Sequence, residues 1–183
     1  MHNLFTKFIA GVAAIGIASG AYALVLQLIK SATLQSLTEY NISVDQALLV
    51  AQGALDACKK DNANISVAVV DHNGGVRFLL RGDGASAQDA DNARKKAYSA
   101  RTFRMTTTDW IERTSFEAVD EKGVKRDLNG QRYLENTLAE PGGVPIMWHG
   151  DAIGGVGVTG AKDGAADEAC AKAGLEAISD QLL

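Results

Sequence analysis

The segment PGGVPIMWHGDAIGGVGVTGA, residues 141–161, decides the fold of this chain. Two apolar runs, residues 144–148 and 152–158, flank the short sequence His149-Gly150-Asp151. Apolar runs on either side of a tight turn predict a β-hairpin. Outside the turn the segment holds six glycines. They indicate bulges, or places where another backbone or a flat ligand comes close, although a tightly packed core hairpin would use glycines too.

The rest of the chain predicts helices and strands in a mixed order. Ser43 with Gln46, and Ser86 with Asp89, have the spacing of residues that cap the start of a helix. A β-branched run is followed by a turn rich in Asn and Gly, which predicts a second hairpin. The predicted elements are a helix over 43–58, strands over 65–70 and 76–81, a helix over 86–103, a short helix from 110 and a last helix over 165–178.

The N-terminal residues have the layout of a secretory signal peptide. Lys7 is followed by an apolar run and by Ala21-Tyr22-Ala23, which predicts cleavage after Ala23. The alternative is an uncleaved membrane anchor through residues 8–29, because that stretch is uncharged and long enough to span a bilayer. In either case we expect the globular part to lie outside the cytoplasm, in the periplasm or in the extracellular medium.

Length and charge limit the possible classes of protein. The formal net charge of the 183-residue chain is −4, which argues against a nucleic-acid partner, since such proteins neutralise phosphates with a positive field. We expect a signal peptide or anchor at 1–23, a lead-in segment at 24–42 and one domain at 43–183. A membrane partner is expected only if the N-terminal segment is not cleaved.

The chain contains two cysteines, Cys58 on the first predicted helix and Cys170 on the last. In an exported protein such a pair is compatible with a disulfide, and equally with two small buried side chains. A CxxC motif is absent from the sequence. Neither a zinc site nor a thioredoxin-like activity is therefore predicted.

Several sequence blocks, taken in order, resemble the GlcG/HbpS family of haem-binding proteins, which is also similar to the C-terminal domain of PduO. The resemblance covers about Val44 to Ile178. The blocks that carry it are VAVVD at 67–71, GDGA at 82–85, KAY at 96–98, GGVPI at 142–146, IGGVGVTGA at 153–161 and DEACAKAGL at 167–175.

This resemblance implies an α+β fold. The expected architecture is a single domain in which an antiparallel sheet of about five strands is covered by helices, with profilin-like layering. It also implies a homo-oligomer with haem, and therefore iron, bound in clefts near the subunit interfaces. Exported members of the family exist, in agreement with the predicted signal peptide.

Haem requires an apolar slot, cations for two propionates and, as a rule, an axial ligand to the iron. The chain after Ala23 offers two histidines, His72 and His149, and both fall in predicted turns. They are the candidate metal ligands, although a histidine in a turn is also an ordinary polar surface residue. Tyr98 is a lesser candidate, and the resemblance implies a role for Thr107.

The predicted helix over 86–103 and its end carry several cations. Charge and location suggest Lys96, Arg101 and Arg104 as partners of the haem propionates, because guanidinium groups fit carboxylates in a bidentate geometry. A solvated helix face would carry the same residues.

We predict an exported protein that carries, stores or senses haem. Two other classes remain open: an enzyme acting on a small organic acid, and a structural oligomer subunit without haem. The sequence shows no nucleophile beside a base and no defensible pair of catalytic carboxylates, which favours a protein that is not an enzyme.

Overall fold

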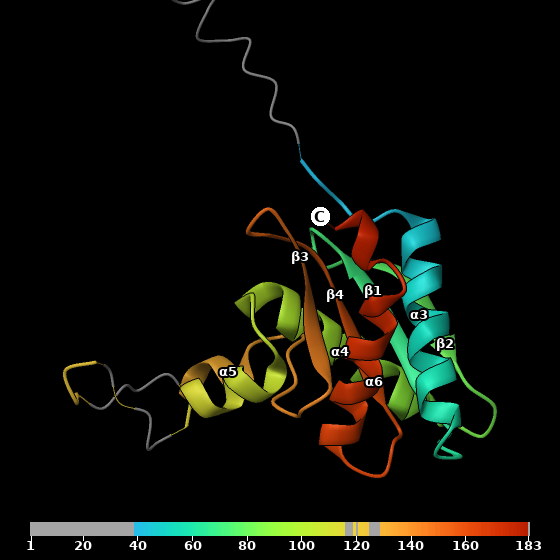
Figure 1. Ribbon diagram of the computed structural model, residues 1–183. Coiled ribbons are helices and arrows are strands. Elements are labelled where there is room, and N and C mark those ends of the chain that lie inside the picture. Colours follow the sequence, from blue (N-terminus) through green and yellow to red (C-terminus); the bar gives the residue numbers. More distant parts are fainter. Residues whose placement is uncertain (1–38, 116–118, 120, 125–128, 183) are drawn as a thin grey trace, which may run out of the picture. The chain divides into compact units, whose positions relative to one another are not determined.

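A computed structural model describes residues 39–115, 119, 121–124 and 129–182 (Figure 1). The predicted N-terminal signal or anchor and most of the lead-in segment lie outside the described residues. The elements of the described part, in chain order, are α3 (Val44–Lys59), β1 (Ser66–Asp71), β2 (Val76–Arg81), α4 (Ala87–Phe103), α5 (Thr107–Arg113), the 3₁₀ helix η1 (Asn129–Tyr133), β3 (Gly143–Trp148), β4 (Asp151–Thr159), α6 (Gly164–Glu176) and the 3₁₀ helix η2 (Ser179–Gln181).

The strands form an antiparallel sheet in the order β2-β1-β4-β3. Two hairpins, β1–β2 and β3–β4, are joined through the pairing of β1 with β4, which runs from Ser66 opposite Thr159 to Asp71 opposite Gly154. The α+β antiparallel architecture is confirmed. Among the described residues the sheet has four strands rather than about five.

The predicted central hairpin is confirmed by the register of β3 and β4, in which Trp148 pairs with Asp151 across a two-residue turn. The φ angles of His149 and Gly150 are 46° and 84°. Positive φ at both central residues matches the twist of the flanking strands. Glycine adopts this conformation freely, whereas a side chain such as that of His149 adopts it at a cost of about 1–2 kcal/mol.

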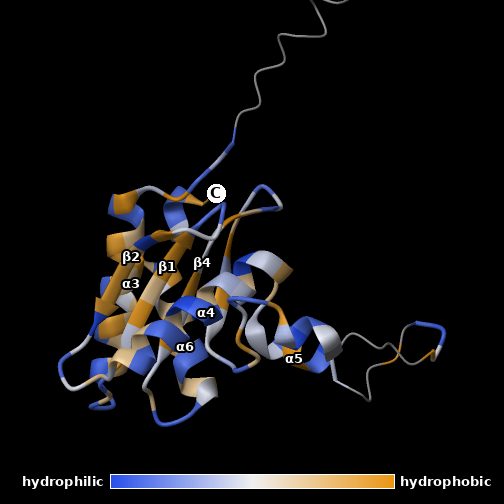
Figure 2. Ribbon diagram, turned by 180° about the vertical axis from the view of Figure 1, so that it is seen from behind, coloured by the Kyte–Doolittle hydropathy of each residue, from blue (hydrophilic) through white to orange (hydrophobic). Residues whose placement is uncertain are grey.

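Helices cover the two faces of the sheet (Figure 1). On one face α3 and α6 pack over the larger hydrophobic core, which includes Val67, Val69, Val156 and Val158. On the other face α4 covers Ala68 and its neighbours with its own small residues. Figure 2 shows the outer side of α4 as largely hydrophilic, in keeping with one buried face.

The glycines of the central segment allow α4 to lie directly on the sheet. A Cβ atom at Gly157 would overlap the carbonyl oxygen of Ala93 and stand 2.5 Å from the amide nitrogen of Ala97. A Cβ at Gly155 would overlap the carbonyl oxygen of Ala97. The close approach predicted from the glycines is therefore that of a helix backbone.

Local sequence signals set the starts of the two long helices. The Ser43 hydroxyl accepts a hydrogen bond from the Gln46 amide, and the Gln46 side chain accepts one from the Ser43 amide. Ser86 and Asp89 make the same reciprocal pair at the start of α4. Both predicted capping boxes are confirmed.

Cys58 of α3 and Cys170 of α6 form a disulfide across 112 positions of sequence. The bridge links the two helices of one layer. This settles the two alternatives left open by the sequence in favour of a disulfide.

The beginning of the described chain joins the core. Ile42 is 1% exposed, and its amide donates to the Ile153 carbonyl of β4 at 3.3 Å. Among the described residues, none of the helices has the length and apolarity needed to cross a membrane.

Candidate functional site

One end of the sheet presents the β3–β4 turn with aromatic side chains around it. His149 is exposed, and its ring meets the Trp148 indole edge-on, with centroids 4.1 Å apart. Tyr40 also contacts the indole, with ring centroids 4.0 Å apart and the planes tilted by 47°. An exposed imidazole therefore stands beside a half-buried indole and an exposed tyrosine ring. We call Tyr40, Trp148 and His149 the aromatic tip.

Cations from the end of α4 lie beside the aromatic tip. Arg104, in the left-handed conformation at the end of α4, donates hydrogen bonds to the Gly150 carbonyl and, at 3.4 Å, to Asp151. Arg101, one turn earlier, packs its Cβ near Gly155. Its Nε is buried and has no hydrogen-bond partner among the described residues. Such an orphaned donor is costly unless another molecule supplies an acceptor.

The second histidine lies at the same end of the sheet. His72 follows β1, and its half-buried ring places Nδ1 3.2 Å from the Ala152 carbonyl of β4. The Tyr98 ring of α4 lies against Gly74 in the turn after His72. Compared with His149, His72 is more enclosed and already has a backbone contact.

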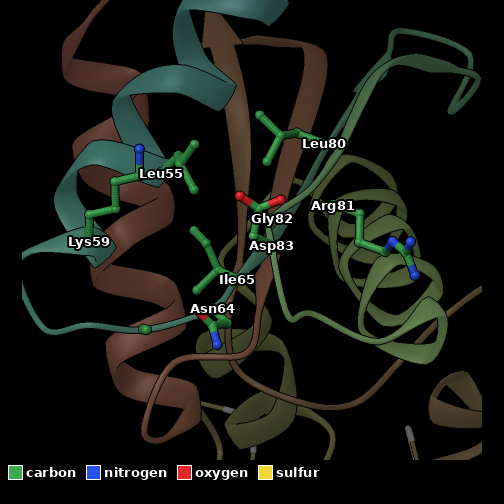
Figure 3. A pocket seen from close by; sticks show the side chains of 9 residues that line it. Leu55, Lys59, Asn64, Ile65, Leu80, Arg81, Gly82 and Asp83 are labelled. Carbon is green, nitrogen blue, oxygen red and sulfur yellow. The ribbon is translucent and has the colours of Figure 1, made fainter.

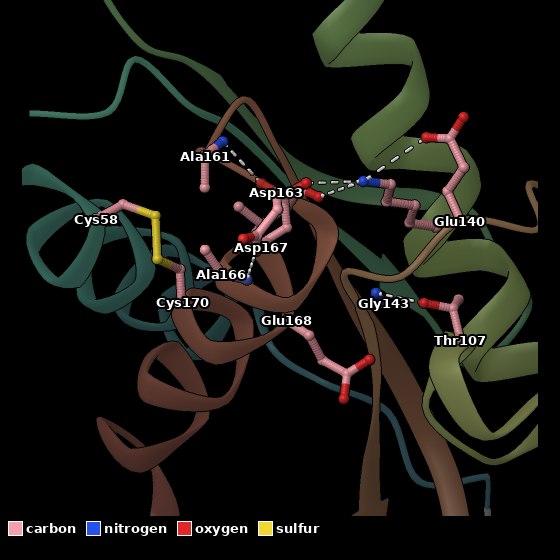
Figure 4. A network of polar contacts seen from close by, with 12 residues as sticks. Cys58, Thr107, Glu140, Gly143, Ala161, Asp163, Ala166, Asp167, Glu168 and Cys170 are labelled. Atoms are coloured by element: carbon pink, nitrogen blue, oxygen red, sulfur yellow. Dashed lines mark hydrogen bonds and ion pairs between the residues drawn. A yellow bond between two sulfur atoms is a disulfide. The ribbon is translucent and has the colours of Figure 1, made fainter. Parts of the chain in front are cut away.

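Lys96 is buried and lies away from this end. Its side chain is 2% exposed, and Nζ donates to Asp167 at 2.9 Å and to the Val158 carbonyl at 3.1 Å, with Glu140 4.0 Å away. Asp167 also accepts from the Ala161 amide at 2.8 Å (Figure 4). Burial raises the pKa of Asp167, and these two hydrogen bonds oppose the rise. The ammonium thus already has a carboxylate, and a solvated position for Lys96 is ruled out.

Thr107, at the start of α5, is also buried. Its side chain is fully enclosed, and Oγ1 accepts a hydrogen bond from the Gly143 amide at 2.9 Å. The next residue, Thr108, donates to the buried Glu168 at 2.6 Å, and Lys172 donates to the other carboxylate oxygen of Glu168. These contacts tie α5 to β3 and α6 and hold the Thr107 side chain in place.

The seven predicted site residues thus separate into two groups. Lys96 and Thr107 lie where β3 begins and β4 ends. The opposite end, with the two turns, carries His72, Tyr98, Arg101, Arg104 and His149. The residues between Asp151 and Val158 separate the ends by about 20 Å, at roughly 3.3 Å per residue.

A haem site within one subunit would require a cavity at the aromatic tip. The three cavities described for this chain lie elsewhere, and none is lined by a histidine. One, of about 440 Å³, lies between the ends of α3 and β2, where Leu55, Leu80 and the Asp83 carboxylate face one another (Figure 3). The chemistry of the aromatic tip, with an exposed imidazole and nearby guanidinium groups, nevertheless fits a haem held against its surface.

Two features of the site were not predicted. Tyr40 lies in the predicted lead-in segment, where no periodic pattern marks it. Asp167 forms the buried ion pair with Lys96, and a signal for it existed in the sequence. It occupies an inward position of α6 together with Cys170, Ala171 and Gly174, and a carboxylate among small buried residues requires a partner.

Fold and site together define an α+β protein with a helix-covered four-stranded sheet and an exposed histidine at one sheet end. The model of the haem-degrading HbpS-like proteins matches residues 42–176. This chain therefore belongs to the HbpS-like family.

Solved structures support the assignment. A double mutant of HbpS from Streptomyces reticuli is 31% identical, with a TM-score of 0.70 over 78% of this chain and 90% of that one. ORFY from Klebsiella pneumoniae is 25% identical, with a TM-score of 0.67 over 79% and 95% of the two chains. PduOC, solved with heme, is 21% identical with a TM-score of 0.65 over 75% and 95%, and shows the fold alone. No curated protein sequence matches this chain.

Proposed function

We propose that this protein binds haem at the aromatic tip, with His149 as the axial ligand to iron. Family membership supports a haem-related function, and the exposed position of His149 supports this site. Its imidazole is exposed at the tip of a hairpin, in a backbone conformation unfavourable for a side chain. Strain of this kind gathers at functional sites, where the surrounding structure maintains it.

The neighbours of His149 supply the other interactions that haem needs. Trp148 and Tyr40 offer aromatic side chains against which the macrocycle can pack. Arg104 and the half-buried Arg101 supply guanidinium groups for propionates. When bound, the haem would supply an iron centre, while the chain itself ligates, orients and shields it.

His149 is exposed at the end of the hairpin, so a haem bound there would keep one side open to solvent. We propose that a second copy of the chain covers that side, so that haem lies near a subunit interface. Export to the periplasm or the extracellular medium is part of the proposal. Its support is the layout of residues 1–23 and the disulfide between Cys58 and Cys170, since such bridges persist in oxidising compartments.

Haemin titration of the purified protein tests this function. A saturable Soret shift, with one haem per subunit or per pair of subunits, is the expected result. The oligomer mass, measured by light scattering in the same samples, should be a multiple of the subunit mass. Featureless absorbance that increases without saturation would refute haem binding and would favour an enzyme for a small organic acid, or a structural subunit.

The family description makes haem breakdown a second candidate activity. The exposed position of the aromatic tip favours it, because small oxidants and reductants would reach a haem held there. Incubation of the haem-loaded protein with ascorbate in air separates the two. Loss of the Soret band faster than for free haemin would indicate degradation, whereas a stable band would indicate carriage or sensing.

A further inference from the structure

A second candidate site lies at the opposite end of the sheet from the aromatic tip. A cavity of about 410 Å³ opens between α4, the start of α6 and the segment before β3. Its lining includes Asp89, Lys96, Glu140, Thr159, Asp163 and Asp167. The volume suits a small molecule, and none of the predicted haem ligands lines it.

The inner wall of this cavity has unmet hydrogen-bonding capacity. The buried Lys96 ammonium has three protons, and Asp167 and the Val158 carbonyl accept two of them. Within the described part of the chain, no further acceptor lies within hydrogen-bonding distance of Nζ, since Glu140 is 4.0 Å away. Thr159 is 8% exposed, and its hydroxyl is buried with no partner. Buried polar groups of native proteins are rarely left unpaired.

The side chain of Thr159 faces this cavity. Successive residues of a strand point to opposite faces of the sheet. Gly155 and Gly157 face α4, and Thr159 lies two residues further along the same strand. The cavity is walled on that side by Asp89 and Lys96 of α4. Thr159 and Lys96 both line this cavity, so a ligand inside it lies beside the unpaired hydroxyl and the buried ammonium.

The charges around the cavity select the kind of ligand. Lys96 pairs with Asp167 at 2.9 Å and with Glu140 at 4.0 Å. With Asp89 and Asp163, the lining sets four carboxylates against one lysine. This excess of negative charge repels anions and attracts a cation. The described residues contain no group of three or more His, Cys, Asp or Glu placed to hold a metal ion. An organic cation fits the cavity better than a metal ion.

We propose that this cavity binds a small amino alcohol. The hydroxyl of the ligand accepts a hydrogen bond from Lys96 and exchanges one with Thr159, while its ammonium lies among the carboxylates near Glu140. The inner wall requires a neutral oxygen, because an ammonium group of the ligand at this place would be repelled by the Lys96 ammonium. The outer part requires a positive charge. A molecule of two to four carbons satisfies both requirements within the cavity.

Isothermal titration calorimetry in phosphate buffer tests the proposal, since Tris is itself an amino alcohol. Ethanolamine should bind saturably to the full chain, ethylamine more weakly, and glycolate not at all. Thr159→Val keeps the shape of the side chain and removes the hydroxyl, so it should weaken ethanolamine binding by about three- to tenfold, the effect of one hydrogen bond. Glu140→Gln, at an exposed position, should weaken it by a similar factor by removing one negative charge.

Glu176→Gln is the matched control, because Glu176 is an exposed carboxylate outside the cavity, and it should leave binding unchanged. Circular dichroism verifies that each variant is folded. Absence of saturable ethanolamine binding would overturn the proposal. So would equal affinity of Thr159→Val and the wild-type protein, or preferential binding of glycolate. Haemin titration of the same variants should be unaffected, which separates this site from the aromatic tip.

Discussion

The packing of α4 on glycines makes a strong prediction for Gly157→Ala. The added Cβ would overlap the Ala93 carbonyl and stand 2.5 Å from the Ala97 amide nitrogen. Backbone atoms of a 17-residue helix, rather than the end of a flexible side chain, would have to move. Overpacking of this kind costs about 1–3 kcal/mol, and rigid obstacles place the cost near the upper value. Alanine also restricts the unfolded chain more than glycine does, which offsets about 0.4–1 kcal/mol of this cost.

We therefore expect a net loss of about 2–2.5 kcal/mol in the free energy of unfolding, measured by urea denaturation. The melting temperature of a domain of this size should fall by about 5–10 °C as a result. Gly130→Ala is the matched control, because a Cβ there meets no atom of the described residues within 4 Å and needs no unusual φ. It should be neutral or slightly stabilising. If Gly157→Ala stays within 0.5 kcal/mol of the wild type, the close approach of α4 to the sheet is wrong.

Three further predictions concern charges and the disulfide. Asp167→Leu should leave the Lys96 ammonium buried without its carboxylate and cost about 3–5 kcal/mol in urea unfolding. Adding Lys96→Met should recover part of that loss, and equal losses in the single and double variants would contradict the pairing. Replacing Cys58 and Cys170 by alanine should cost about 2–5 kcal/mol, because the bridge closes a long loop; an unchanged calorimetric melting curve would argue against it. The pKa of Asp91 is lowered, chiefly because its carboxylate accepts a hydrogen bond from Lys95. Its contribution to stability is therefore present above the unfolded pKa of about 3.9 and is lost as the pH falls through the folded value. Asp91→Asn should cost at most about 1 kcal/mol at pH 7, because the side chain is partly exposed, and nothing near pH 2. A loss that does not change with pH would refute this assignment.

Elements with local signals were predictable from the sequence. The caps at Ser43 and Ser86 and the tight turn at His149 depend on residues within a few positions of each other, so their spacing reveals them. The pairing of β1 with β4 was not predictable in this way. It joins segments about 90 positions apart, such as Ser66 and Thr159, and no local pattern specifies such a register.

The candidate site was predictable in its chemistry more than in its arrangement. The cations of α4 were identified by charge, yet the fold buries Lys96 against Asp167 and leaves Arg104 exposed beside the turn. Which face of a helix is buried depends on what the helix covers. Here α4 covers Gly155 and Gly157, and a pattern of alternating glycines opposite alanines would have indicated that contact.

The central claim is that His149 ligates haem at the aromatic tip. Haemin titration of the wild type, His149→Ala and His72→Ala, followed by absorption in the Soret region, tests it most directly. We predict that His149→Ala moves the Soret maximum and weakens binding by at least about tenfold, whereas His72→Ala leaves the maximum unchanged. A His149→Ala spectrum and affinity identical to those of the wild type would contradict the claim and leave the hairpin with a structural role only.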